Sequence, residues 1–373
     1  MKVLHINSYY TLAPLYKNLY DEQQLGGCDI DVYVSCRKGQ KILTKNFGTY
    51  SKLSYDFNTL DRLFFYRKHR KILASIKKEY NFNSYDVIHA HSLFSNGYIA
   101  YKLNQLYNIP YIVAVRNTDV NVFFKRMPYL RKLGVDILRK ASGIVFISEP
   151  YKHYVLEQYI PQDEADIFKM KTTVIPNGIN KFWLENLNFK QKAEIKHNEI
   201  KILCVGDIDK NKNYLTTLNA CIELNNRNYN TEFHVVGRVI DQKIFKSLQK
   251  FSGFYYHGTM HKEQLLQLYR KYDIFVMPSK AETFGLVYAE AISQGMPVIY
   301  TKDQGFDGQF KDGEVGFAVK YDNVPEIVQR IVYIYDNLAV FSKRCSEYAN
   351  KFSWKRICLE YKKIYLEVKR NVI

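Results

Sequence analysis

The sequence lacks the short patterns that mark several common classes of protein. Its six cysteines are scattered without C-x-x-C spacing, which argues against a zinc knuckle or disulfide scaffold and favours a reducing cytoplasm. No run approaches the ~18 apolar residues that a membrane span needs, and the N-terminus turns polar too early for a secretory signal. No G-x-G-x-x-G or Walker loop follows an expected strand, which argues against dinucleotide dehydrogenases and P-loop enzymes.

Length and composition indicate two packed domains. The chain has 373 residues, and a domain usually has about 100–200. With 47% hydrophobic and 24% charged residues, the composition is that of a packed soluble protein and excludes a disordered chain.

Positive charge is in excess and clustered. Lys and Arg number 54 against 37 Asp and Glu, a net charge of +17. Seven basic residues and no acid lie from Arg62 to Lys78, and six lie from Lys125 to Lys140 with Asp136 as the one acid. The clusters indicate an anionic partner: nucleic acid, an anionic membrane surface or phosphorylated substrates.

Short apolar segments alternate with longer amphipathic ones, which is typical of βα units around a parallel sheet. In the first half we expect strands at 3–7, 30–35, 86–90, 111–115, 143–148 and 173–175, and helices near 14–24, 58–80, 96–107, 122–140 and 150–160. After Pro176-Asn177-Gly178 and a polar linker or surface stretch at 185–199, strands are expected at 200–205, 232–236, 254–257, 274–277, 297–300 and 315–319, and only helices at 323–370.

This alternation predicts an α/β protein of two tandem Rossmann-like, doubly wound domains. The boundaries fall at 1–178 and 179–353, with a final helix in 354–373. Ligands of such sheets bind beyond the carboxyl ends of the strands, so a site is expected in a cleft between the domains.

The segment from Pro278 to Ala291 carries the strongest functional pattern. It follows an apolar strand and enters a helix near Gly285 that should end at about Gln294, with Gly295 as its stop. A helix start binds phosphate well. Glu282 precedes this helix and Glu290 lies inside it, so the two carboxylates flank the expected phosphate site rather than form one acid–base pair. A surface Glu and an ordinary helix Glu are the alternative.

A second strand–loop–helix segment opens the second domain, with Gly206 ending the strand and Lys212 at the next helix start. A cation there opposes the helix dipole by ~0.3–1 kcal/mol. A charge-assisted bond to phosphate contributes ~1.5–3 kcal/mol, so a bound anion would make the position favourable. A solvated lysine is the alternative.

Taken together, these segments resemble glycosyltransferase family 4, whose members have the GT-B fold, over essentially the whole chain. The matching elements are Asn177-Gly178-Ile179, Val205-Gly206 with Lys212-Asn213, Glu282-x7-Glu290 around Phe284-Gly285-Leu286, and Phe352-Ser353-Trp354. The resemblance implies a retaining enzyme, an acceptor-side first domain, a donor-binding second domain and a C-terminal helix that crosses back to the first.

The resemblance also implies roles for single residues. Glu282 would face the donor sugar, Lys212 would bind the diphosphate, and Glu290 would bind the ribose. Further donor contacts would come from Gly206, from the backbone of Phe284, Gly285, Leu286 and Val287, and from Gly305 or Asp307. No cofactor and no metal are expected, and neither an Asp-x-Asp motif nor a histidine cluster; the donor would be a UDP- or GDP-sugar.

Three positions depart from the family pattern. Asp207 stands where the family often has Arg, and the loop from Ser8 to Leu12 lacks the usual glycines. Arg116 replaces a histidine near the donor; it could contact a phosphate or anionic sugar, or pair with an acid such as Asp119. His91, after another strand, is a candidate active-site residue, with a structural role as the alternative. Glu282, His91 and Arg116 are thus the catalytic candidates.

The basic clusters also contain aromatic residues at roughly helical spacing, which suggests peripheral docking on the cytoplasmic face of the membrane. A solvated face over an ordinary core is the alternative. The candidate docking residues are Arg62, Arg67, Lys68, Arg70, Lys71, Lys77, Lys78, Lys125, Arg126, Arg131 and Lys132.

The leading function is transfer of a hexose or N-acetylhexosamine from a nucleotide sugar to a lipid-linked or oligosaccharide acceptor during bacterial surface polysaccharide synthesis, such as O-antigen, capsule or exopolysaccharide. A catalytically inactive, membrane-associated relative and a GT-B sugar-nucleotide epimerase are the alternatives. Nucleic-acid binding is disfavoured, because no recognition-helix, RRM or zinc motif accompanies the charge.

Overall fold

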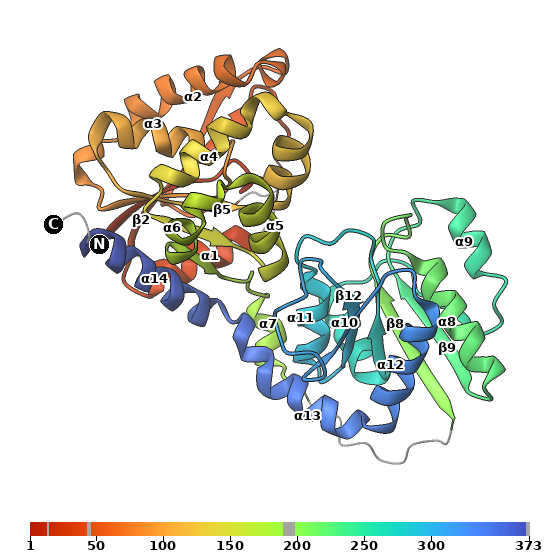
Figure 1. Ribbon diagram of the computed structural model, residues 1–373. Helices are drawn as coiled ribbons and strands as arrows, with labels where there is room; N and C mark the ends of the chain where they lie inside the picture. The colour runs from red at the N-terminus through yellow and green to blue at the C-terminus, as the bar shows by residue number, and fades with distance from the viewer. Residues whose placement is uncertain (13–14, 43–45, 189–197, 371–373) are drawn as a thin grey trace. The chain divides into compact units, whose positions relative to one another are not determined.

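The protein forms two compact α/β units in a computed structural model that describes residues 1–12, 15–42, 46–188 and 198–370 (Figure 1). Unit 1 comprises Met1–Gly178 and the chain from Trp354 onward; unit 2 comprises Ile179–Ser353. Part of the polar stretch expected as a linker, 189–197, lies outside the described residues. No helix in the described part of the chain is long and apolar enough to cross a membrane.

Unit 1 is built on a seven-stranded parallel sheet with the order β3-β2-β1-β4-β5-β6-β7. The strands are β1 (Lys2–Ile6), β2 (Asp29–Arg37), β3 (Ser51–Phe57), β4 (Val87–Ala90), β5 (Tyr111–Val115), β6 (Gly143–Phe146) and β7 (Thr172–Val174). The helices are α1 (Leu15–Leu25), α2 (Phe65–Glu79), α3 (Gly97–Tyr107), α4 (Arg131–Lys140), α5 (Glu149–Tyr159), α6 (Ala165–Met170) and α14 (Trp354–Arg370).

Helices cover both faces of this sheet (Figure 1). Helices α2 to α6 contribute to the core on one face, and α1 and α14 contribute to the core on the other. Strands buried on both faces appear in the sequence as continuous apolar segments. For this reason the bounds of β4 to β6 were predicted to within one or two residues. The edge strand β3 was missed, because its half-exposed pattern gives little hydrophobic signal.

Unit 2 repeats the design with a six-stranded parallel sheet in the order β10-β9-β8-β11-β12-β13. Its strands are β8 (Glu199–Val205), β9 (Asn230–Val236), β10 (Phe254–Tyr256), β11 (Ile274–Val276), β12 (Val298–Thr301) and β13 (Gly316–Val319). Its helices are α7 (Lys181–Glu185), α8 (Tyr214–Asn226), α9 (Gln242–Leu248), α10 (Lys262–Lys271), α11 (Leu286–Ser293), α12 (Val324–Asp336) and α13 (Leu338–Tyr348). The predicted pair of doubly wound domains is therefore confirmed.

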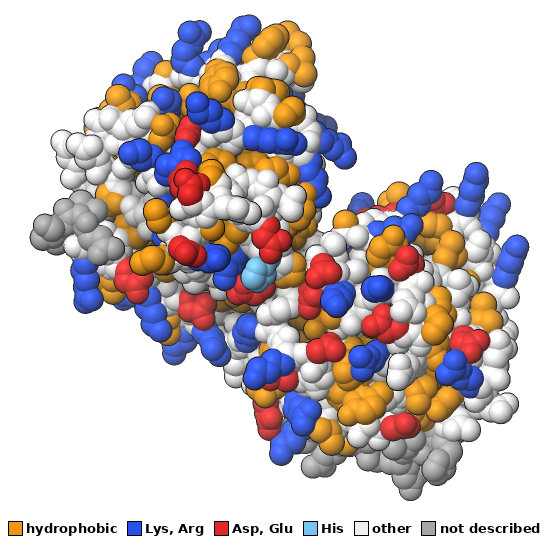
Figure 2. All heavy atoms as spheres, in the orientation of Figure 1, with side chains coloured by type: hydrophobic (Ala, Val, Ile, Leu, Met, Phe, Trp, Pro, Cys, Tyr) orange, Lys and Arg blue, Asp and Glu red, His pale blue; other side chains and the backbone are white. Residues whose placement is uncertain are grey.

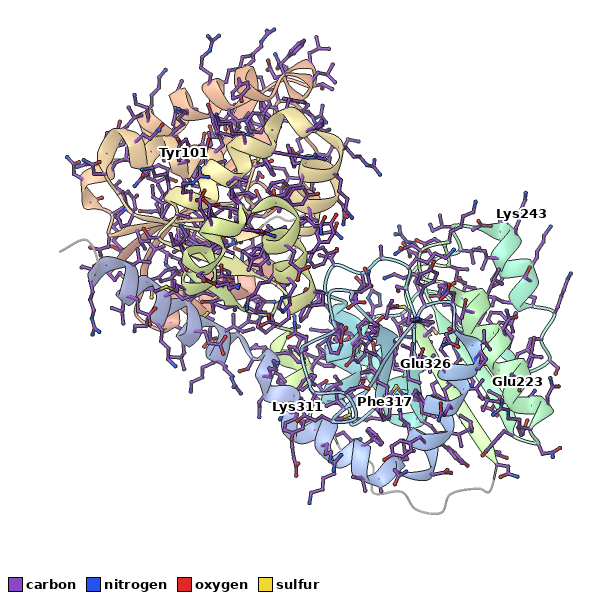
Figure 3. All side chains as sticks on the ribbon, viewed as in Figure 1. Tyr101, Glu223, Lys243, Lys311, Phe317 and Glu326 are labelled. Carbon is purple, nitrogen blue, oxygen red and sulfur yellow. The ribbon has the colours of Figure 1, made fainter. Side chains whose placement is uncertain are left out.

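Local sequence explains where individual helices begin. At the start of α12, Asn323 Oδ1 accepts the N–H of Glu326 at 3.3 Å, while Glu326 Oε2 accepts the N–H of Lys320 at 3.2 Å; Glu326 is labelled in Figure 3. Such caps satisfy N–H groups that have no partner inside the helix. The helix expected at 122–140 is interrupted instead: a π-helical turn at Asp119–Phe124 is followed by Pro128, and α4 begins at Arg131.

The chain enters and leaves unit 2 along neighbouring paths. In unit 2 the N–H of Ile179 donates to the carbonyl of Phe352 at 3.0 Å. In unit 1 a Cβ added to Gly178 would lie 2.5 Å from the Trp354 ring, so only glycine lets the indole pack against the backbone. From there α14 packs on α1, where Gln23 Nε2 donates to the Tyr365 hydroxyl at 3.1 Å. The last helix therefore belongs to the core of unit 1.

Candidate functional site

The loop after β11 leads into α11 through a glycine with a left-handed backbone. Gly285 has φ +78°, and a Cβ on it would lie 2.4 Å from the Tyr288 ring. The Tyr288 hydroxyl donates to the Met277 carbonyl at 2.6 Å, which ties the first turn of α11 to the strand end. The N–H groups of Leu286 and Val287, in that first turn, have no carbonyl partner within the helix, and N–H groups of this kind can bind an anion. The predicted strand, loop, Gly285 and helix are all present.

An ion pair joins this loop to the loop after β8. Lys212 Nζ lies 2.7 Å from Glu282 Oε2, with the two side chains 21% and 13% exposed. Asn211 holds the same two loops together: its side chain donates to the Ala281 carbonyl at 2.9 Å and accepts the Ala281 N–H at 3.0 Å. The structure thus brings two predicted site residues into direct contact.

Gly206 directly follows β8 and lies beside the Lys212 side chain. Its N–H donates to the Val236 carbonyl at 2.8 Å, and a Cβ on Gly206 would lie 3.4 Å from Lys212 Cε. The lysine stem therefore runs over this glycine. Lys212 is further positioned by Asp209, whose carboxylate accepts the Lys212 N–H at 2.9 Å.

Asp207, at the position where an arginine was expected, forms a bidentate ion pair with Arg238. Arg238 Nε and Nη2 donate to its two carboxylate oxygens at 3.0 and 2.6 Å, and these bonds lower the pKa of Asp207. Arg238 follows β9, the strand beside β8, so a guanidinium reaches this place from the neighbouring strand. Arg238 was not among the residues predicted for the site; its position directly after Gly237 at a strand end was the available signal.

The expectation of no Asp-x-Asp motif is wrong, because Asp207 and Asp209 have this spacing, which occurs in metal-dependent sites. Here Asp207 is bound to Arg238, and Asp209 Oδ1 accepts the N–H groups of Asn211 and Lys212 at 2.8 and 2.9 Å. Both carboxylates are therefore bound by groups of the protein's own loops.

Glu290 lies inside α11, away from the Lys212–Glu282 pair along the helix, as predicted. Burial raises the pKa of its carboxyl to about 7, although interactions with Trp183 and Tyr269 oppose the shift. Trp183, on α7, is buried and accepts a bond from Gln294 Nε2 at its carbonyl at 3.2 Å. Glu290 is thus a carboxyl that changes charge near neutral pH.

Gly305 contacts the loop that carries Glu282, and Asp307 stabilises the loop that contains Gly305. The N–H of Gly305 donates to the Glu282 carbonyl at 3.0 Å, and a Cβ on Gly305 would lie 1.9 Å from the Thr283 carbonyl oxygen. Asp307 accepts the N–H groups of Asp303 and Gly308 at 2.8 and 2.9 Å. Phe284 is buried beside these loops, where its ring contacts Phe306.

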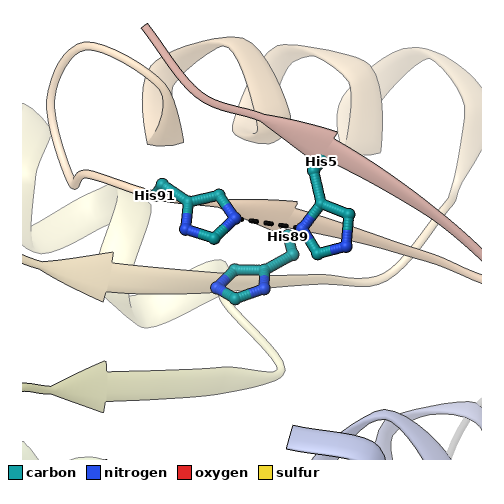
Figure 4. Close-up of side chains that lie close together, drawn as sticks. All are labelled: His5, His89 and His91. Carbon is teal, nitrogen blue, oxygen red and sulfur yellow. Dashed lines mark hydrogen bonds between the residues drawn. The ribbon is translucent and has the colours of Figure 1, made fainter. Parts of the chain in front are cut away.

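In unit 1, His91 belongs to a buried group of three histidines (Figure 4). His5 on β1 pairs in register with His89 on β4, and His91 follows β4. His5 Nδ1 and His91 Nε2 lie 3.0 Å apart, and His89 Nδ1 lies 2.7 Å from the Tyr365 hydroxyl. The expectation of no histidine cluster is therefore wrong, because alternate residues of adjacent parallel strands point to the same face.

All three rings are fully buried, and burial lowers their pKa values, that of His5 to about 3. One nitrogen from each ring lies within 4.8 Å of the others, so neutral imidazoles are gathered at a spacing that could hold a metal ion. The positive charge of Arg116 also lowers the pKa of His91, and the same charge would repel a divalent cation.

Arg116 and Asp119 hold the loops after β4 and β5. Arg116 Nε donates to the His91 carbonyl at 3.4 Å. Asp119 accepts three backbone N–H groups, those of Leu93, Phe94 and Arg116, at 2.9, 3.0 and 2.9 Å. Burial nevertheless raises the pKa of Asp119 to about 6. Asp119 therefore binds the Arg116 backbone, whereas the guanidinium reaches the His91 loop.

The predicted basic residues divide into paired and exposed groups. Arg67 and Lys71 both bind the buried Asp61, at 3.1 and 2.7 Å. Arg131 Nε donates to the Phe124 carbonyl at 2.7 Å, and Lys125 lies over the Tyr154 ring. Lys68 is half-buried, and the remaining basic residues are exposed: Arg62, Arg70, Lys77, Lys78, Arg126 and Lys132.

Both parts of the chain match known families. Residues 16–181 match the family described as Glycosyltransferase Family 4, and residues 185–352 match Glycosyl transferases group 1. An uncharacterized 41.2 kDa protein in the cps region of Klebsiella pneumoniae is 26% identical over 98% of this chain and 99% of its own length. The alpha-monoglucosyldiacylglycerol synthase of Acholeplasma laidlawii is 24% identical over 68% of this chain and 67% of its own.

Solved structures share the fold. Sucrose-phosphate synthase from Thermosynechococcus elongatus superposes with a TM-score of 0.75 at 18% identity, covering 100% of both chains. Anabaena HepE, in complex with UDP and glucose, superposes with a TM-score of 0.65 at 16% identity, covering 97% of this chain and 98% of its own. With family matches to both domains and these GT-B neighbours, the chain belongs to the family 4-like glycosyltransferases.

Proposed function

We propose that the protein transfers a hexose or N-acetylhexosamine, with retention of configuration, from a UDP- or GDP-sugar to a lipid-linked or oligosaccharide acceptor in bacterial surface polysaccharide synthesis. The observation that carries the proposal is the Lys212–Glu282 ion pair, 2.7 Å long, beside the start of α11. A cation, free helix N–H groups and two separated carboxyls match the diphosphate, the sugar and the ribose of one donor.

In this proposal, donor binding rearranges the ion pair. The Lys212 ammonium exchanges the Glu282 carboxylate for diphosphate oxygens, and the released carboxylate then accepts hydrogen bonds from the donor sugar. Glu290 accepts bonds from the ribose hydroxyls. Binding of the diphosphate thereby prepares the group that orients the sugar.

Charge stabilisation at the leaving diphosphate is the main catalytic contribution we assign to unit 2. Negative charge develops there as the glycosidic bond breaks, and Lys212 with the α11 N–H groups is placed to stabilise it. Arg238 supplies a second cation next to Asp207. The departing phosphate oxygen takes the proton of the acceptor hydroxyl, so Glu282 needs no role as a nucleophile.

The relatives support the acceptor and donor assignments. The name of the Klebsiella relative refers to a cps region, and the Acholeplasma relative is named for a glycosylated diacylglycerol. Among the structural neighbours, HepE binds UDP and glucose. A hexosyl donor with a uridine base and an acceptor carried by a lipid follow these precedents, and a guanosine base is the alternative that the nucleotide titration below tests.

We place the protein at the cytoplasmic face of the cell membrane, bound peripherally through the basic residues of unit 1. In Figure 2, Lys and Arg side chains surround hydrophobic ones over the part of unit 1 that α2 occupies in Figure 1. Exposed Leu60, Phe64 and Tyr66 stand among these charges, with 71, 58 and 54% of their surface accessible. Such a mixture suits an anionic lipid surface.

The first prediction concerns nucleotide binding. Calorimetric titration with UDP, GDP, ADP and CMP should show one preferred nucleotide, and Lys212→Ala should weaken it about 10–100-fold, the loss of one charge-assisted bond. Glu290→Ala should also weaken it. Glu282→Gln should instead tighten it several-fold, because no carboxylate competes for Lys212, while sugar transfer falls at least ~100-fold.

The matched control is Lys210→Ala, which removes an exposed lysine of the same loop. It should change neither the nucleotide affinity nor the rate of sugar transfer. Absence of binding by every nucleotide would contradict the proposal and favour the inactive relative. Nucleotide binding with conversion of the sugar nucleotide and no transfer would favour the epimerase.

The second prediction concerns pH. Because the pKa of Glu290 is raised to about 7, the carboxyl is largely protonated at pH 6 and ionised at pH 8. The ionised form accepts ribose hydroxyls with both oxygens, so affinity for UDP-glucose, or for the matching nucleotide sugar, should rise about 3–10-fold from pH 6 to 8. A nucleotide sugar is used because it lacks the terminal phosphate that titrates near pH 6. Glu290→Gln should flatten the profile; an unchanged profile in that variant would assign the effect to another group.

The third prediction concerns metal. Arg116 lies beside the histidine cluster, and its charge opposes a divalent cation. Elemental analysis of purified protein should therefore find zinc well below one equivalent per chain, and EDTA should leave transfer unchanged. Stoichiometric metal that is lost in a His89→Ala variant would show that the cluster is a metal site.

The fourth prediction concerns the membrane. In flotation with phosphatidylglycerol vesicles, the protein should bind at low salt and dissociate as salt rises. Reversing Arg70, Lys77 and Lys78 to Glu should reduce partitioning at least ~100-fold, at ~1 kcal/mol per basic residue. These positions spare Arg67 and Lys71, which bind Asp61. The control reverses Lys243, Lys246 and Lys250 of unit 2 (Lys243 is labelled in Figure 3); equal loss in both triple variants would refute docking through α2.

A further inference from the structure

A cavity of about 710 Å³ lies in unit 1, apart from the residues assigned to the donor. Its walls come from the ends of the strands and the segments that follow them: Ser8 and Tyr9 after β1, Arg37 at the end of β2 with Gln40 and Lys41 after it, Phe57 at the end of β3, and Thr118 after β5. The cavity therefore occupies the carboxyl edge of the sheet, where ligands of doubly wound domains bind.

Positive charge lines this cavity without compensation. Arg37, Lys41, Arg62 and Lys68 contribute to the wall, and no Asp or Glu is present among the described residues that line it. The nearby acid, Asp61, is already bound by Arg67 and Lys71, which lie outside the lining. An anion in the cavity would thus meet cations that no carboxylate neutralises.

Lys68 is the most confined of these cations. Burial, and after it the charge of Arg62, lowers the pKa of Lys68 to about 8. Its ammonium lies over the Phe57 ring, 4.7 Å from the centroid, and it has no carboxylate partner within the described part of the chain. An anionic ligand would stabilise the charged form of this half-buried ammonium, which burial alone disfavours.

The rim of the cavity is apolar. Leu12, Leu63 and Tyr129 line it and have 70, 75 and 65% of their surfaces exposed. Phe65 and Phe123 form the wall deeper inside, and their rings contact one another. Large exposed apolar side chains at a cavity mouth mark a surface that a hydrophobic partner covers.

We propose that this cavity binds the acceptor through a phosphate or diphosphate group joined to an apolar chain. The anionic group lies between Lys68 and Arg62, and the chain leaves along Leu12, Leu63 and Tyr129. The inference rests on the proposed function and deepens it, since it names the chemistry of the acceptor. Peripheral docking of the neighbouring basic face would bring such a lipid to the cavity mouth.

The test uses soluble probes, so that binding is separated from adsorption to a membrane. The full-length protein is titrated by calorimetry with farnesyl diphosphate below its aggregation concentration, with farnesol, with inorganic diphosphate and with dihexanoyl phosphatidic acid. We expect farnesyl diphosphate or the phosphatidic acid to bind at least tenfold more tightly than farnesol and inorganic diphosphate. Binding of either lipid supports the inference, and the lipid that binds more tightly identifies the kind of apolar chain that the cavity prefers.

Two variants separate the anionic and the apolar contacts. Lys68→Ala should weaken the preferred lipid about 10–100-fold, whereas Lys140→Ala, an exposed lysine of α4 outside the cavity, should not. Leu63→Ser should weaken the lipid but leave inorganic diphosphate unaffected. Because Leu63 is exposed, this change should leave folding intact.

Nucleotide titration of the same proteins distinguishes the two proposals. If UDP or GDP binds and Lys68→Ala leaves that binding unchanged, loss of lipid affinity in the variant supports the cavity. The inference is overturned if neither lipid binds, if Lys68→Ala binds as tightly as the wild type, or if inorganic diphosphate binds as well as the lipids. Failure of nucleotide binding would overturn the proposed function instead.

Discussion

The contact between Lys212 and Glu282 is the interaction on which the candidate donor site depends. It joins the loops after β8 and β11, two neighbouring strands of one parallel sheet. The pair is mostly buried, so removing one partner would leave the other charge desolvated. A ligand with a diphosphate can replace the carboxylate, because it brings more negative charge and more acceptor oxygens to the same ammonium. The ion pair therefore keeps the Lys212 side chain in position, and a ligand can still replace the Glu282 carboxylate as its partner.

The positive charges of the two units are arranged in different ways. In unit 2, Lys212 and Arg238 each have an acidic partner, Glu282 and Asp207. In unit 1, Lys68 and its cationic neighbours have none among the described residues of the cavity wall. An anion reaching unit 2 must exchange with a carboxylate, which favours a ligand of high charge and defined shape. An anion reaching the unit 1 cavity meets bare cations and an apolar rim, which suits an amphiphile.

The sequence predicted what depends on local order along the chain. The doubly wound sheets, the Gly285 turn and the separation of Glu282 from Glu290 follow from hydrophobic patterns and helix rise, and all are present. Contacts that depend on which strands are neighbours in a sheet were not predicted. His5 and His89 are 84 residues apart in sequence and meet only through the β1–β4 register, and Arg238 reaches Asp207 only because β8 and β9 are neighbours. Contacts between Lys212 and Glu282 belong to the same class, although both residues were singled out.

The Asp207–Arg238 pair bears on whether the departures from the family pattern imply lost activity. An aspartate where a cation is expected would weaken phosphate binding if it stood alone. The adjacent strand end, however, delivers a guanidinium within 2.6 Å of that aspartate. Carboxyl ends of parallel strands converge on one edge, so a charge can move from one strand to the next and still act at nearly the same place. The aspartate in turn fixes the orientation of an otherwise exposed arginine. The substitution therefore leaves a net-neutral ion pair at this position, with the guanidinium held at the end of the neighbouring strand.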